Sequence, residues 1–87
     1  MVVSNRVAVT IGGREYIVRG EESPEYISML ASYVDKRMKE IEARSPFLPP
    51  GKVAVLAALN IADELKKLER EYETLVQLIS EKRKDPV

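Results

Sequence analysis

Residues 53–65 read VAVLAALNIADEL, and this stretch decides the fold. Residues 53–62 are apolar nearly all round a helix, interrupted only by Asn60, so this half of a helix must be covered on several sides. From Leu65 onward the apolar positions narrow to a stripe at alternating spacings of three and four, which is typical of a coiled-coil seam. The seam residues are Leu65, Leu68, Tyr72, Leu75 and Ile79, and the same register extends backward through Ile61, Ala58 and Ala54.

This pattern predicts one helix from about residue 52 to about residue 83. A chain of 87 residues cannot cover both the apolar half and the seam by itself, so we expect it to associate with further copies. The spacing does not distinguish a dimer from a tetramer, or a parallel coil from an antiparallel one. Asn60 lies off the main seam. It either sets register or oligomer order through a hydrogen-bonded partner, or sits at the margin of the packed face.

Residues 6–19 predict a β-hairpin, because apolar and polar side chains alternate before the glycine pair at 12–13 and strand-favouring residues follow it. Two consecutive glycines supply the positive-φ positions that a two-residue turn requires. This turn fixes the register so that Ile11 faces Arg14. In that register the face predicted to be buried carries Val7, Val9, Tyr16 and Val18.

Ser23 and Pro24 predict the start of a first helix, as N-cap and first helical residue. Ser45-Pro46 ends this helix, and the connector at 49–51 contains two prolines and a glycine. An apolar stripe at helical spacing carries Ile27, Leu30, Ala31, Val34, Met38 and Ile41. Tyr26 and Tyr33 lie on the flank of the stripe, where we expect them to pack.

The fold class predicted is therefore α+β, in an oligomer. Residues 1–50 form a head of β-hairpin and short helix, and residues 51–87 form the long coiled-coil oligomerisation helix.

Composition excludes several classes of function. The chain has no cysteine and no histidine, so it lacks thiolate and imidazole ligands and the commonest general base. Neither a nucleophile–base pair nor a glycine-rich phosphate loop is present. We predict no catalytic residue, no metal and no cofactor, and a protein that is not an enzyme.

Charge and hydropathy restrict the partners. The 14 basic residues balance the 14 acidic ones, whereas proteins that neutralise phosphates normally carry a basic excess, so we predict no nucleic-acid partner. The apolar run at 53–59 is far too short to span a bilayer, so we predict no membrane association. The N-terminus lacks a basic-then-apolar signal pattern, and we expect a cytosolic location.

The residues also resemble a known family. The segments RVAVTIGGREY at 6–16, SPEY at 23–26 and YVDKRM at 33–38 resemble the head of the bacterial cell-division protein ZapA. The run at 53–65 is similar to that family's most recognisable stretch. The resemblance covers nearly the whole chain and consists of packing residues rather than a catalytic signature.

The resemblance implies a protein that binds the tubulin-like GTPase FtsZ and bundles its protofilaments at the mid-cell division ring. Proteins of the family form dimers that pair through their coils into a dumbbell-shaped tetramer. Carried over by position, the FtsZ-binding candidates on the head are Arg14, Lys36, Arg37 and Arg44. Leu56, Asn60 and Ile61 would lie where the long helices meet.

Two alternatives stay open. The same fold and oligomer could serve as a scaffold or adaptor for another protein, because the seam specifies only self-association. A DNA-binding dimer of the ribbon–helix–helix type also combines a strand with two helices. It is disfavoured because the strand already pairs within its own hairpin and the net charge is zero.

Overall fold

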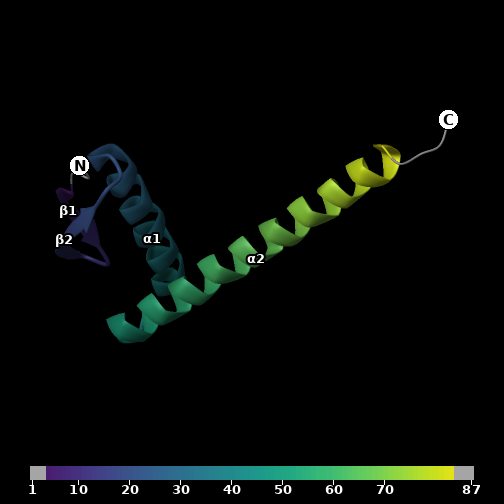
Figure 1. The fold of residues 1–87 in the computed structure, drawn as a ribbon. Coiled ribbons are helices and arrows are strands. Elements are labelled where there is room, and N and C mark those ends of the chain that lie inside the picture. Colours follow the sequence, from purple (N-terminus) through teal and green to yellow (C-terminus); the bar gives the residue numbers. More distant parts are fainter. Residues whose placement is uncertain (1–3, 84–87) are drawn as a thin grey trace.

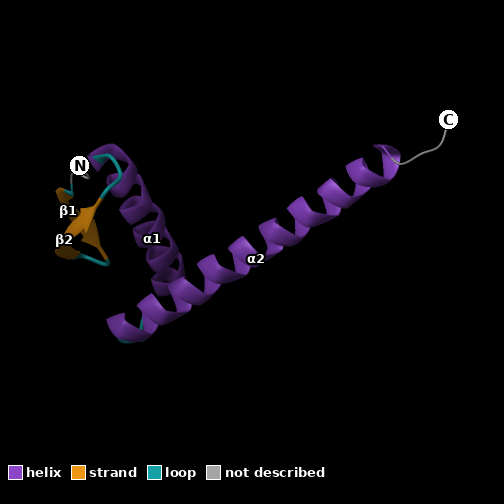
Figure 2. Ribbon diagram, viewed as in Figure 1, coloured by secondary structure: helices purple, strands orange, loops and turns teal. Residues whose placement is uncertain are grey.

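The computed structural model describes residues 4–83, which form two strands followed by two helices. The elements are β1 (Asn5–Ile11), β2 (Arg14–Gly20), α1 (Pro24–Arg44) and α2 (Pro50–Arg83), in the order shown in Figures 1 and 2. This is the α+β arrangement predicted from the sequence. α2 begins two residues earlier than predicted, and residues 84–87 of the predicted coil segment lie outside the described residues.

The hairpin register is the predicted one. Ile11 pairs with Arg14, Val9 with Tyr16 and Val7 with Val18 in an antiparallel ladder. Gly12 and Gly13 have φ values of 61° and 78°, a region that L-residues with a Cβ rarely adopt. The glycine pair therefore makes the two-residue turn possible.

α1 begins and ends at the predicted residues. The Ser23 side chain accepts a hydrogen bond from the Tyr26 N–H, Pro24 occupies the first turn, and the Ser45 N–H donates to the Ile41 carbonyl. The predicted apolar stripe is only partly covered within one chain, because Leu30 is 47% exposed. The hairpin covers only the side of α1 that carries Ile27 and Ala31, and Leu30 lies beyond its edge.

The hairpin packs on α1 through a small core of Val9, Ile27 and Ala31, with Val7, Ile11 and Val18 around it. The predicted burial of Tyr16 was wrong, because this side chain is 48% exposed. α1 packs mainly against β1, so the buried face of the sheet is covered on the β1 side and largely uncovered along β2.

A second core joins α2 to the head. Val53 and Ala57 on α2 are almost completely buried against Met38 of α1, with Ile11, Val34, Ile41 and Leu48 at the margin. The predicted boundary at residue 50 is therefore the point where α2 begins, but the core of the head continues into this helix. The first two turns of α2 belong to the head, and the rest of the helix leaves it as a rod.

The molecule is strongly elongated (Figure 1). Its radius of gyration is 18.7 Å, whereas a compact domain of this length has a value of about 12 Å. α2 alone is about 51 Å long at 1.5 Å per residue. Beyond the crossing with α1, it extends with no other described element beside it.

Within residues 4–83, neither helix contains an apolar segment long enough to cross a membrane. The same residues contain no group of three carboxylates placed to hold a metal ion.

The turn glycines provide a test of the packing. A Cβ on Gly12 would lie 2.7 Å from the terminal methyl of the buried Met38, whereas a Cβ on Gly13 would meet nothing within 4 Å. We expect Gly13→Ala to lower the free energy of unfolding by about 1 kcal/mol through the positive φ alone. Gly12→Ala should cost more, because Met38 must also move. Urea unfolding at one fixed chain concentration measures the free energy of unfolding of both variants. Equal decreases in the two variants would show that Met38 moves aside without a cost in free energy.

Candidate functional site

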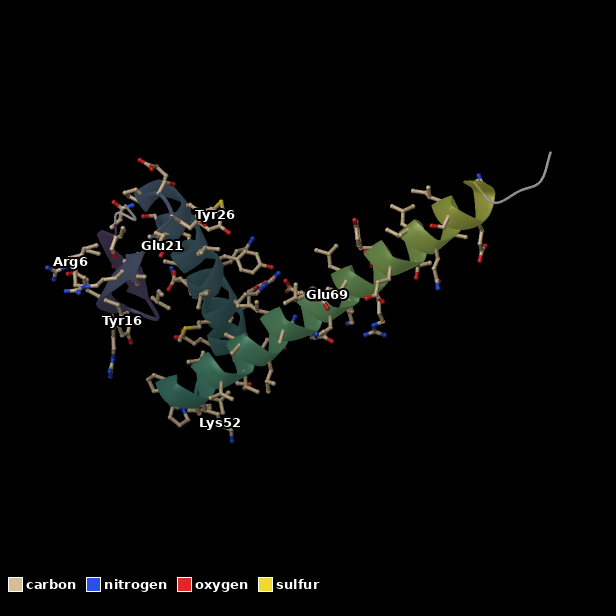
Figure 3. The ribbon with its side chains drawn as sticks, in the orientation of Figure 1. Arg6, Tyr16, Glu21, Tyr26, Lys52 and Glu69 are labelled. Carbon is tan, nitrogen blue, oxygen red and sulfur yellow. The ribbon has the colours of Figure 1, made fainter. Side chains whose placement is uncertain are left out.

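The predicted coiled-coil seam is uncovered in the single chain. Leu65, Leu68, Tyr72, Leu75 and Ile79 are between 46% and 68% exposed. They lie along the part of α2 that has left the head; Glu69 in Figure 3 marks this region. While this stripe stays in water, its side chains do not gain the favourable free energy of transfer from water to an apolar environment. The structure therefore presents a surface suited to a second helix.

The apolar half of α2 is covered on one side only. Val53 and Ala57 are buried against α1, Leu56 and Ile61 are half-buried, and Val55 and Leu59 are exposed. Asn60 is also exposed. It borders a polar cleft of about 280 Å³ between α1 and α2. The cleft is lined by Arg37, Glu40, Ile41, Arg44, Asn60, Asp63 and Glu64.

A further apolar surface lies on α1. Tyr26, Met29, Leu30 and Tyr33 are each between 43% and 57% exposed. Tyr26 projects from the side of α1 that faces away from the hairpin (Figure 3). Tyr26 and Tyr33 were expected to pack, but within one chain half of each side chain is open.

Arg37 joins the two helices. Its guanidinium lies 2.6 Å from Glu64 of α2 and 2.9 Å from Glu40 of α1. It also donates to the Tyr33 hydroxyl, lies over the Tyr33 ring, and is 26% exposed. Tyr33 in turn donates a hydrogen bond to Glu64. This network fixes the crossing of α1 and α2.

The contacts shift the protonation equilibria of the network. The hydrogen bond from Tyr33, followed by the contacts with Arg37, lowers the pKa of Glu64 below its ordinary value. Hydrogen bonds to Tyr33, Glu40 and Glu64 raise the pKa of Arg37. Both groups are therefore held in their charged forms at neutral pH.

Asp35 holds the hairpin turn to α1. One carboxylate oxygen accepts a hydrogen bond of 2.9 Å from the Gly12 N–H, and the other lies 2.9 Å from Lys39. Lys39, and after it the Gly12 amide, lowers the pKa of Asp35. Since the turn is anchored here, the position of Arg14 beside it is fixed relative to the helix.

The four basic candidates do not form one cluster. Arg14 lies at the hairpin end and is exposed. Lys36 is exposed on α1, while Arg37 and Arg44 line the cleft beside α2. Of the four, Arg37 is the one engaged in ion pairs within the described residues.

Comparison with known proteins identifies the family. The family model described as "Cell division protein ZapA" matches residues 7–85. The chain belongs to the ZapA family of cell division proteins. The ZapA of Shouchella clausii is 48% identical over 68 residues, which are 78% of this chain and 87% of that protein. The ZapA of Geobacillus thermodenitrificans is 47% identical over 70 residues, 80% of this chain and 77% of its own.

Solved structures agree with the fold. A ZapA mutant dimer from Geobacillus stearothermophilus has a TM-score of 0.70 and 40% sequence identity. An unknown conserved bacterial protein from Pseudomonas aeruginosa has a TM-score of 0.66 and 29% identity. Each comparison covers 90% of this chain and 91% of the other. The predicted family is confirmed, and the dimeric ZapA supports self-association of this chain.

Sequence reasoning missed the structural network around Arg37. The spacing of Tyr33 and Arg37 by four residues places them on one helical face and could have indicated their contact. The partner Glu64 had no such signal, because it is 27 residues away along the chain and meets Arg37 only through the crossing of the helices. The contact of Asp35 with the hairpin turn was missed for the same reason.

The Tyr33–Glu64 contact predicts a pH-dependent stability. A carboxyl whose pKa is lower in the folded state contributes stability above its unfolded pKa and loses it as pH falls through the folded value. We therefore expect Tyr33→Phe to be less stable than the original chain at neutral pH. The difference should shrink as pH drops below 4.5, the ordinary value for Glu64.

Tyr26→Phe is the matched control, since Tyr26 lies on the same helix, is equally exposed, and its hydroxyl makes no hydrogen bond within the described residues. Unfolding midpoints at neutral and acidic pH measure both variants at one chain concentration. A Tyr33→Phe loss that is identical at both pH values would contradict this account of Glu64.

The seam predicts a change in oligomer size. Leu68 is 62% exposed in the single chain, so Leu68→Lys should leave the fold of one chain intact and place a charge in the helix–helix contact. We expect a smaller mass by analytical ultracentrifugation. Gln77→Lys adds the same charge on the opposite side of the helix and should keep the original mass. No difference between the two variants would contradict the seam.

Proposed function

We propose that this protein binds FtsZ and crosslinks its protofilaments, and so promotes assembly of the division ring at mid-cell. The observation that supports this most directly is the shape of a ZapA-family chain: one head at the end of a long helix with an unpaired apolar seam. Joining copies through that seam puts two or more heads on one particle. A particle with several heads holds two filaments together through avidity, without a new contact in the head.

The proposed assembly uses the whole exposed length of α2. Dimers form through Leu65, Leu68, Tyr72, Leu75 and Ile79, and dimers pair further into tetramers. Leu56 and Ile61 extend the contact toward the head, where both are half-buried and leave apolar surface for another copy. Asn60 lies beside them at the polar cleft, where an amide can hydrogen-bond to a second chain.

The proposed FtsZ contact uses the basic residues of the head. Arg14, Lys36 and Arg44 are exposed and make no ion pair within residues 4–83. They are therefore free to meet acidic groups of a partner. Arg37 acts differently, because Glu64 and Glu40 already hold its guanidinium. We assign it to the positioning of α1 against α2.

This function involves no catalytic step, cofactor, nucleic acid or membrane, and it places the protein in the cytoplasm, where FtsZ polymerises. The second candidate is a coiled-coil scaffold for another protein. It is favoured by the second exposed apolar surface on α1, which contains neither the seam residues nor the basic residues assigned to FtsZ.

Co-sedimentation with FtsZ polymerised in GTP tests the proposal, with microscopy of the same samples. We expect enrichment of the protein in the pellet together with laterally bundled filaments. Arg14→Glu should reduce both. Arg70→Glu makes the same charge change at an exposed α2 position opposite the seam and should reduce neither.

The result that would overturn the proposal is absence from the pellet at both low and moderate salt. The scaffold function would then replace it. Pelleting without bundling would support binding to FtsZ and contradict crosslinking.

A further inference from the structure

The outer edge of β2 is open. Within residues 4–83 the sheet has two strands, so each strand has one edge without a neighbour there. In a hairpin with a two-residue loop, the residues that flank the loop form a hydrogen-bonded pair and the pair type alternates from there. The N–H and C=O groups of Arg14, Tyr16 and Val18 therefore point toward β1. Those of Glu15, Ile17 and Arg19 point outward, and none of them bonds to a group elsewhere in residues 4–83.

The side chains along this edge are also uncovered. Tyr16 is 48% exposed and Ile17 is 56% exposed, on opposite faces of the sheet. In Figure 3, Tyr16 projects from the β2 side of the hairpin. Next to it lies a mostly apolar groove of about 490 Å³, bordered by β2, by Val34 and Met38 of α1, and by the start of α2. An edge strand with exposed apolar side chains beside a groove is suited to receive another strand.

We propose that the β2 strands of two copies pair antiparallel about a two-fold axis at Ile17, forming one continuous four-stranded sheet. In this register Ile17 faces Ile17 of the second copy. Tyr16 faces Val18, and Glu15 faces Arg19 of the second copy, each twice by symmetry. The outward groups of Glu15, Ile17 and Arg19 then satisfy one another across the axis.

The charge pattern selects this occupant and this register. Opposite charges directly across an antiparallel pair are favourable, and the symmetric pairing provides two such pairs. A shift of the axis by one residue in either direction places Glu15 or Arg19 opposite Ile17 instead. Pairing through β1 about Ala8 brings Arg6 opposite Thr10 and yields no ion pair. The sequence of β2 is therefore complementary to itself, and that of β1 is not.

The groove gives the second copy a place for its aromatic side chain. Residues that face each other across a ladder lie on the same side of the sheet. Tyr16 of the second copy thus points to the side of Val18, where the groove opens between β2, Val34 and Met38. The pairing buries the side chain that α1 leaves half exposed. It joins heads and not coils, so it is separate from the seam. Arg14, the candidate for FtsZ binding, lies at the end of the same strand and borders the groove.

Single cysteines test the pairing, because the natural chain has none. In the proposed sheet the two Ile17 Cα atoms are about 5.5 Å apart, which is within reach of a disulfide. Ile17→Cys should therefore give covalent dimers under mild oxidation, seen on a non-reducing gel and lost on reduction. Ala8→Cys is the matched control. It faces Ile17 on the outer strand, and its two copies are about 14 Å apart across three strand spacings, so it should stay monomeric on the gel.

A charge exchange provides the second measurement. In the Ile17→Cys background, Glu15→Arg places like charges opposite each other and should slow crosslinking roughly threefold or more. Adding Arg19→Glu restores opposite charges in exchanged positions and should restore the rate. Crosslinking of Ile17→Cys no faster than that of Ala8→Cys would overturn the pairing. The pairing would also be contradicted if adding Arg19→Glu to Glu15→Arg left crosslinking as slow as with Glu15→Arg alone. That result would show that residues 15 and 19 do not face each other across the two copies.

Discussion

The apolar surface of α2 exceeds what one chain can cover, and the rest of the molecule follows from this constraint. Within residues 4–83, the buried apolar side chains of the helix lie in its first two turns, where Val53 and Ala57 pack against Met38. The remaining stripe is left open along a rod. Burial of that stripe by other copies would remove its apolar side chains from water, and the head alone buries only a few side chains. Association of copies through this stripe should therefore add to the stability of a chain that already has a folded head.

In the head, polar contacts between elements supplement a small core in a chain that has no cysteine and so no disulfide. The hydrogen bond from Gly12 to Asp35 fixes the hairpin turn to α1, and the contacts among Tyr33, Arg37 and Glu64 fix α1 to α2. Each of these polar contacts joins two elements that also share a small apolar core. In the proposed crosslinking of FtsZ, a head of fixed geometry would hold its binding surface in a constant orientation relative to the long helix.

The basic residues of the head have two different roles, structural ion pairing and exposure at the surface, which the sequence does not distinguish. Arg37 contacts two carboxylates and a phenol ring, whereas Arg14 is exposed at the hairpin end. A positive charge at a helix surface is equally compatible with either role, and only the position of Glu64 distinguishes them. For that reason the predicted set of four basic residues separates into exposed candidates and one positioning residue.

The sequence by itself determined the local structure: the glycine turn and its register, the Ser23–Pro24 helix start, and the long apolar helix. These depend on residues near one another along the chain, so spacing and φ preferences suffice. The tertiary structure decided which faces are covered. α1 packs against β1, which leaves Tyr16 and Leu30 exposed, and the crossing with α2 pairs Arg37 with Glu64. These features depend on how elements meet in space, and periodicity specifies an apolar face without specifying the element that covers it.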